Sequence, residues 1–183
     1  YDEITAEDAF FGKYADTMVT ICEQTLKSVK MLKGKRNEKI VFQGIAIELD
    51  MNKPFKAQTI VLKSSGLFGK AKTFEGMERF KPDDDLSDKY FEVYTGDVEE
   101  ARNLLLPSLV KRLIKLKEAY KAKSIQVAFY ANRVLIGIET REDMFEPCEF
   151  FKTHLNKDKF DETFEQFWAV FCIVHHLRTN QNL

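Results

Sequence analysis

Hydrophobic and polar positions alternate through much of the first half of the chain, and this period of two predicts β-strands. A loose alternation over residues 18–31 is followed by a charged turn at 33–37 and by a regular alternation over 40–49. One face of this last strand is formed by Ile45, Ile47 and Leu49. Residues 51–54 then turn the chain, and we expect residues 57–62 to return as an antiparallel partner.

The pattern changes at residues 64–86, which contain glycines, a proline and three consecutive aspartates, and which we expect to form a long loop. Residues 90–95 then predict a short strand with aromatic side chains on both faces, both of them covered. Farther along, residues 125–129 and 134–138 alternate around a turn at 131–132 and predict a β-hairpin.

Apolar residues three and four positions apart predict helices in the second half of the chain. Asp97 is a predicted N-cap, and Glu100 would complete a capping box at the start of a helix over residues 98–106. Pro107 either kinks this helix or opens a second one at its first position. That second helix has an apolar stripe of Leu109, Leu113, Leu116 and Tyr120. A last helix begins near Asp158, and its stripe consists of Phe160, Phe164, Phe167, Trp168, Phe171 and Val174.

Together these elements predict a single α+β domain over residues 1–183. We expect a mostly antiparallel sheet of five to seven strands, flanked by the two longer helices. A pleckstrin-like curved sheet closed by the C-terminal helix is one form that such a domain takes. Sixteen phenylalanines predict a core held together by aromatic packing.

Composition narrows the class of protein. The net charge of −1 gives no overall field that would favour nucleic acid or an acidic substrate. Three widely spaced cysteines argue against a disulfide framework and suit a reducing compartment. No stretch reaches the roughly 20 apolar residues that span a bilayer, and no secretory signal is present. The chain begins at Tyr1 instead of methionine, so we expect it to be either a processed product or part of a longer protein.

The helix after Pro107 has the most distinctive surface, because its basic residues are set against Glu118 alone. These basic residues are Lys111, Arg112, Lys115, Lys117, Lys121 and Lys123. The structural interpretation is that cations near a helix C-terminus complement its dipole. The functional interpretation is contact with an anionic surface, either lipid headgroups or an acidic partner protein. Nucleic acid is not an expected partner, because no aromatic residues interleave with the cations.

Candidate chemistry is weak elsewhere. Residues 66–70 resemble a phosphate-binding loop only superficially, since the spacing is wrong and no serine or threonine follows the lysine. Cys172 and His176 are one helical turn apart and form half of a zinc site, which Cys148 and His154 could complete. Their spacing matches no standard finger, however, and buried cysteine usually behaves as a small hydrophobic residue. We therefore assign no catalytic, cofactor-binding or metal-binding residue.

Three segments resemble a family of bacterial proteins of unknown function. The first comprises residues 90–97 (YFEVYTGD), 100–102 (EAR) and 104–107 (LLLP), and is similar to the family signature F-x-V-Y…D…E-A…L-L-x-P. The second is Phe42-Gln43-Gly44, leading to Pro54-Phe55-Lys56 and Thr59, and the third runs from Val127-Ala128-Phe129 through Ile138 to Phe145-Glu146-Pro147. The likeness covers most of residues 42–147.

In that family the domain usually follows one or two membrane-spanning helices, and its gene sometimes lies near those of LemA-like membrane proteins. The resemblance therefore implies a domain tethered to the cytoplasmic side of the bacterial inner membrane, with the tether upstream of Tyr1. It implies no activity, ligand, cofactor or catalytic residue.

The leading prediction is a non-catalytic binding or scaffolding module at the cytoplasmic face of a membrane, with a membrane protein or an anionic lipid surface as partner. Two alternatives stay open. One is a metal-dependent hydrolase that uses the Cys/His or acidic residues, and the other is a structural subunit of an envelope complex. The oligomeric state is not predicted.

Overall fold

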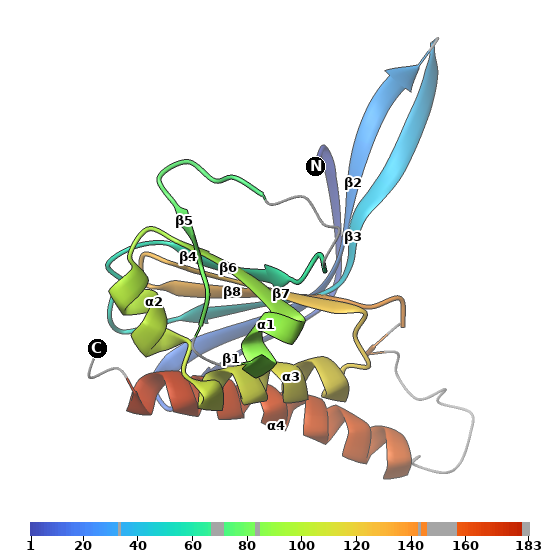
Figure 1. Ribbon diagram of the computed structural model, residues 1–183. Coiled ribbons are helices and arrows are strands. Elements are labelled where there is room, and N and C mark those ends of the chain that lie inside the picture. The colour runs from blue at the N-terminus through green and yellow to red at the C-terminus, as the bar shows by residue number, and fades with distance from the viewer. Residues whose placement is uncertain (33, 67–71, 83–84, 143, 146–156, 181–183) are drawn as a thin grey trace.

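The protein is described by a computed structural model that covers residues 1–32, 34–66, 72–82, 85–142, 144–145 and 157–180. Within this part, eight strands form one sheet, and helices lie against one of its faces (Figure 1). The strands are β1 (Glu3–Tyr14), β2 (Thr17–Leu32), β3 (Lys35–Asp50), β4 (Thr59–Lys63), β5 (Glu78–Phe80), β6 (Phe91–Thr95), β7 (Ser124–Tyr130) and β8 (Arg133–Glu139). The helices are α1 (Asp85–Tyr90), α2 (Val98–Leu104), α3 (Pro107–Ala119) and α4 (Lys157–Thr179).

The strand order is β1-β2-β3-β8-β7-β4-β6-β5, and every neighbouring pair is antiparallel. This confirms the predicted α+β class and the antiparallel sheet, but the predicted number of five to seven strands is wrong. The missed strands are the two edges of the sheet. Nearly all of β1 is exposed, so it has no buried face that alternation could reveal. Strand β5 has three residues and lies inside the predicted loop at 64–86, which also overlaps the start of α1.

The core lies between the sheet and the helices. Ile45, Ile47 and Leu49 of β3 are completely buried on the helix side, as their alternation predicted. The apolar stripe of α3 is buried in the same hydrophobic cluster. The hairpin of β7 and β8 is confirmed as well, and Ala131 in its turn has a positive φ of 47°. Pro107 is the first residue of α3, so it opens a new helix and does not kink the preceding one.

The predicted capping box is only half correct. Asp97 is the N-cap of α2, since its Oδ1 accepts a hydrogen bond from the Glu100 backbone N–H at 3.0 Å. The Glu100 carboxylate does not return to Asp97. It accepts hydrogen bonds from the backbone N–H groups of Lys56 at 2.7 Å and Ala57 at 2.9 Å, while the Asp97 N–H donates to Thr95 Oγ1. Glu100 therefore fastens the segment before β4 to α2.

The C-terminal aromatic stripe is divided between two environments, which corrects the prediction of one continuous buried stripe. Phe167 and Phe171 pack on β1, with ring centroids 5.2 Å from Phe10 and 4.6 Å from Tyr14, and Val174 is buried. The other members of the stripe are exposed: Phe160 (70%), Phe164 (60%) and Trp168 (54%).

Strands β2 and β3 project beyond the other strands as a two-stranded arm (Figure 1). The arm leaves the sheet at Gly44, whose φ is +143°. A Cβ at this position would lie 2.0 Å from the backbone oxygen of Ile138, so only glycine fits. Gly44 therefore permits the close approach of β3 to β8 at the base of the arm.

Candidate functional site

The face of the sheet opposite the helices is hollowed by a groove of about 440 Å³. Its floor contains Ala46, Ala128 and Gly137, which alternate along their strands with residues buried on the helix side. Small side chains at these positions leave the space of the groove open. The remaining side chains of its lining are mostly apolar: Ile4, Leu26, Val41, Phe42, Ile60, Leu62 and Leu135, with Tyr1, Gln24 and Gln126.

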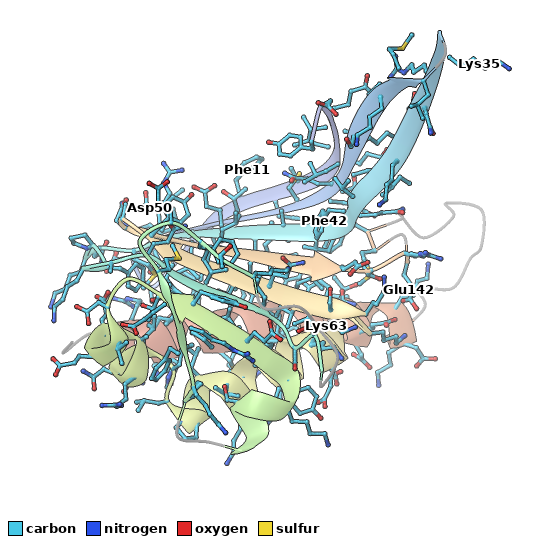
Figure 2. All side chains as sticks on the ribbon, turned by 45° about the horizontal axis from the view of Figure 1, so that its top comes forward. Phe11, Lys35, Phe42, Asp50, Lys63 and Glu142 are labelled. Carbon is cyan, nitrogen blue, oxygen red and sulfur yellow. The ribbon has the colours of Figure 1, made fainter. Side chains whose placement is uncertain are left out.

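Phe42 forms one wall of this groove and lies over Gly137. A Cβ built on Gly137 would be 3.5 Å from Cε2 of the Phe42 ring, which is an ordinary contact distance. Phe42 lies two residues before Gly44, at the base of the arm (Figure 2). Gly44, where the chain bends, is therefore close to Phe42, which bounds the groove.

A second, polar cleft of about 740 Å³ borders the groove, because both are lined by Val41 and Phe42. Its other lining residues are Ile40, Gln43, Lys121, Lys123, Glu139, Thr140, Arg141 and Glu142. Figure 2 shows Glu142 on the same side of the molecule as the base of the arm. An apolar hollow thus adjoins a cleft with three cations.

Ion pairs hold two of these cations. Lys123 Nζ lies 2.7 Å from Glu139 Oε1, and this hydrogen bond, with another from Ser124, lowers the pKa of the Glu139 carboxyl. Lys121 Nζ lies 2.6 Å from Glu162 Oε1, and this contact raises the pKa of the Lys121 ammonium group. Arg141 has no ion-pair partner among the described residues, and it is exposed.

The six predicted cations differ in exposure and in their place in the fold. Lys111 and Lys115 are exposed one turn apart on α3, whereas Arg112 and Lys117 are half-buried. Lys121 and Lys123 follow the helix and line the polar cleft. Contact of the α3 cations with an anionic surface stays a prediction.

Glu92 of β6 is a buried acid that the sequence analysis did not single out. Its carboxylate accepts hydrogen bonds from the backbone N–H and the hydroxyl of Ser65 and from the Tyr94 hydroxyl, and Arg79 Nη2 is 3.8 Å away. The Ser65 hydroxyl is the main cause that lowers the pKa of Glu92, against the effect of burial. A glutamate inside an otherwise apolar strand was the available signal. Because this network holds the chain after β4 against β6, we assign it a structural role.

The residues proposed for zinc are only partly described. His176 is buried between α4 and α3, with Asn180 Nδ2 at 3.0 Å from Nδ1 and Ser108 Oγ at 3.5 Å from Nε2. Burial, with the nearby charge of Arg112, lowers the pKa of this imidazole. Cys148 and His154, like Gly69 and Lys70 of the phosphate-loop resemblance, lie outside the described residues. Among the residues that are described, no three His, Cys, Asp or Glu side chains are grouped to hold a metal ion.

The fold and the groove define an α+β domain with helices on one face of an antiparallel sheet and an apolar hollow on the other. This chain belongs to the family described as protein of unknown function (DUF3137), which matches residues 40–179. Membership of a family of unknown function agrees with the resemblance drawn from the sequence. The signature itself and the link to LemA-like proteins stay predictions.

Among solved structures, the fold is similar to that of the crystal structure of the mycobacterial trehalose monomycolate transport factor A, TtfA. The TM-score is 0.50 at 13% sequence identity, over 95% of this chain and 75% of that chain. At this identity the likeness shows the fold alone. No curated protein matches the chain in sequence. Over the part that the structure describes, no helix combines the length and apolar character needed to cross a bilayer.

Proposed function

We propose that this domain is a non-catalytic binding module at the cytoplasmic face of a membrane, and that its ligand is a single-chain anionic lipid. The observation that carries the proposal is the apolar lining of the groove on the helix-free face of the sheet. An exposed apolar hollow of this kind is typical of a surface that binds something apolar.

The size and composition of the groove suit a small amphiphile. Ligand sites have volumes of about 300 to 1,000 Å³ and are mostly apolar with a few polar groups. The groove falls within this range, and its polar groups are Tyr1, Gln24 and Gln126. Each methylene of an acyl chain that leaves water contributes about 0.8 kcal/mol. The groove therefore favours a chain of methylenes over a polar ligand.

The bordering cleft supports an anionic headgroup. Arg141, Lys121 and Lys123 line it, and charge-assisted hydrogen bonds to carboxylate or phosphate are stronger than neutral ones. A lipid with its chain in the groove would reach these cations past Phe42, which lines both spaces. We expect the headgroup to contact Arg141 first, because no ion pair of Arg141 with another described residue has to break.

The family is one of unknown function, and TtfA, which shares the fold, is named as a factor in the transport of trehalose monomycolate. Placement at a membrane follows from the family resemblance and from the basic residues, and it needs its own test. Nothing among the described residues favours the metal-dependent hydrolase.

The chain-binding part is tested with cis-parinaric acid, a fluorescent fatty acid, titrated into the purified domain and displaced with palmitate. Ala128→Phe places a ring on the floor of the groove and should weaken binding by at least about tenfold. The matched control is Gln58→Phe, which adds the same ring at an exposed position that does not line the groove. Absence of saturable binding, or equal effects of both variants, would contradict the proposal.

The headgroup part is tested by comparing palmitate with hexadecanol, which has the same chain and no charge. Arg141→Gln should weaken palmitate binding several-fold and leave hexadecanol binding unchanged, because the interaction is charge-assisted. Lys111→Gln, on α3, is the control for loss of a cation elsewhere. Placement at a membrane is tested by centrifugation with phosphatidylglycerol vesicles. We expect the domain to sediment with the vesicles, and a domain that stays in the supernatant would contradict the placement at a membrane.

A further inference from the structure

The arm formed by β2 and β3 is far more basic than the chain as a whole. Residues 27–40 contain six basic residues and one acid, Glu38, whereas the whole chain has a net charge of −1. The ladder between β1 and β2 ends at Lys27, so the outer part of the arm is two-stranded. At about 3.3 Å per residue, the stretch of β3 from Gly44 to Lys35 is roughly 30 Å long. Lys35 therefore lies at a tip that stands clear of the rest of the molecule (Figure 2).

The two faces of the arm differ in whether their cations have acidic partners. Residues opposite one another in the ladder of β2 and β3 share a face. On one face, Lys27 Nζ lies 3.1 Å from Glu38 Oε2, and Arg36 Nε lies 2.8 Å from Glu38 Oε1. The opposite face carries three exposed cations that form no ion pair with another described residue: Lys30, Lys35 and Lys39. This second face therefore presents positive charge that the described residues do not neutralise.

The tip of the arm adds apolar surface to this charge. Met31 is 68% exposed and Leu32 is 54% exposed, at the end of β2. Single exposed apolar residues are common on protein surfaces. Here, however, two of them are adjacent at the farthest point of a projecting hairpin, beside Lys30 and opposite Lys35. Lysine can place its apolar stem along such a surface and keep its ammonium group in water or among headgroups.

We propose that the arm docks on an anionic bilayer, with Met31 and Leu32 among the upper acyl chains and Lys30, Lys35 and Lys39 at the lipid phosphates. A bilayer meets both features of the arm, because its anionic headgroups lie directly above an apolar interior. Duplex DNA would meet the cations alone. A basic group close to an anionic leaflet strengthens binding by about fivefold. The inference rests on the membrane placement in the proposed function, and it does not require a lipid in the groove.

The cationic face of the arm is continuous with the groove. Side chains alternate along β2, so Leu26, Ser28, Lys30 and Leu32 lie on the same face of this strand. Leu26 also lines the groove. The face of β2 that we propose for the bilayer is therefore the face that bounds the proposed lipid site.

The contribution of charge is tested by centrifugation with vesicles of phosphatidylglycerol and phosphatidylcholine. Lys30→Glu combined with Lys35→Glu should weaken vesicle binding at least about tenfold. The matched control is Lys111→Glu combined with Lys115→Glu, which reverses two exposed charges on α3 and should weaken binding less than about threefold. Both double variants should bind cis-parinaric acid as the unchanged domain does, which shows that they are folded.

The outcomes separate the arm from the membrane placement. If the unchanged domain sediments and the arm variant sediments equally well, the arm is wrong and the membrane placement stands. An equal or larger loss in the α3 variant also contradicts the proposal, because it assigns the contact to α3 or to net charge. If the unchanged domain stays in the supernatant, both the arm and the membrane placement are wrong.

Insertion of the tip is tested by fluorescence. Trp168 is the only tryptophan in the sequence, so Met31→Trp combined with Trp168→Phe leaves a single reporter at the tip. Its emission should shift to shorter wavelength when vesicles are added, and brominated acyl chains should quench it. The matched control is Met18→Trp combined with Trp168→Phe, since Met18 is 50% exposed near the other end of β2, and its emission should not change. No shift from the tip, or the same shift in the control, contradicts the proposal.

Discussion

Replacing Glu100 by alanine should destabilise the fold by about 2–4 kcal/mol. The Glu100 side chain is nearly buried (7% exposed) and its two carboxylate oxygens accept the backbone N–H groups of Lys56 and Ala57. A hydrogen bond to a charged group contributes about 1.5–3 kcal/mol, so two of them set an upper limit of roughly 6 kcal/mol. Lys56 is exposed, and water can replace part of the lost interaction there, which lowers the expected value.

The measurement is urea unfolding followed by circular dichroism, with the denaturant slope expected to stay constant. Glu100→Gln keeps one acceptor oxygen and should lose about half as much stability. Glu99→Ala, at the exposed neighbouring position, is the control and should change stability by less than about 1 kcal/mol. A loss below about 0.5 kcal/mol in Glu100→Ala would show that the carboxylate does not fasten the segment before β4, and the assignment would be wrong.

Three further predictions concern the N-cap of α2, the buried Glu92 and the glycine at the base of the arm. Asp97→Ala removes the N-cap of α2 and should reduce the unfolding free energy by about 1 kcal/mol. The folded-state pKa of Glu92 is below its ordinary value of 4.5, so its contribution is complete above that pH and is lost as the pH falls through the folded pKa. Glu92→Gln should therefore flatten the loss of stability on acidification, as measured by urea unfolding at a series of pH values. Gly44→Ala should destabilise by at least about 3 kcal/mol, because its Cβ would meet backbone atoms at a positive φ. Gly137→Ala, whose Cβ has only ordinary contacts, should change stability by less than about 1 kcal/mol in the same assay.

Local rules predicted those parts of the fold in which one residue type has one physical role. Asp97 caps a helix because its side chain reaches the N–H three residues on, and Pro107 begins a helix because it lacks an N–H. The alternation of Ile45, Ile47 and Leu49 predicted which face of β3 is buried, since a half-buried strand has to place its apolar residues on one side. Each of these inferences needed only neighbouring residues.

The parts that failed depend on distant residues. β1 is a strand because β2 pairs with it, and its own side chains are mostly exposed. Glu100 has the spacing of a capping box, yet its carboxylate accepts hydrogen bonds from the backbone N–H groups of Lys56 and Ala57, more than forty residues earlier in the chain. The exposed half of the α4 stripe could not be separated from its buried half, because exposed and buried aromatic residues have the same spacing along this helix.

The groove, in contrast, has a sequence signal that was present and unused. Between the buried positions of the central strands stand Ala46, Ala128 and Gly137, where an ordinary solvated sheet face would carry charged or polar side chains. A face that is small and apolar in the middle of a sheet is neither packed by the protein's own helices nor suited to water. The two faces of the same strands therefore differ in what covers them. Large side chains mark the face that the chain covers itself, and small apolar ones mark the face that we propose is left for a ligand.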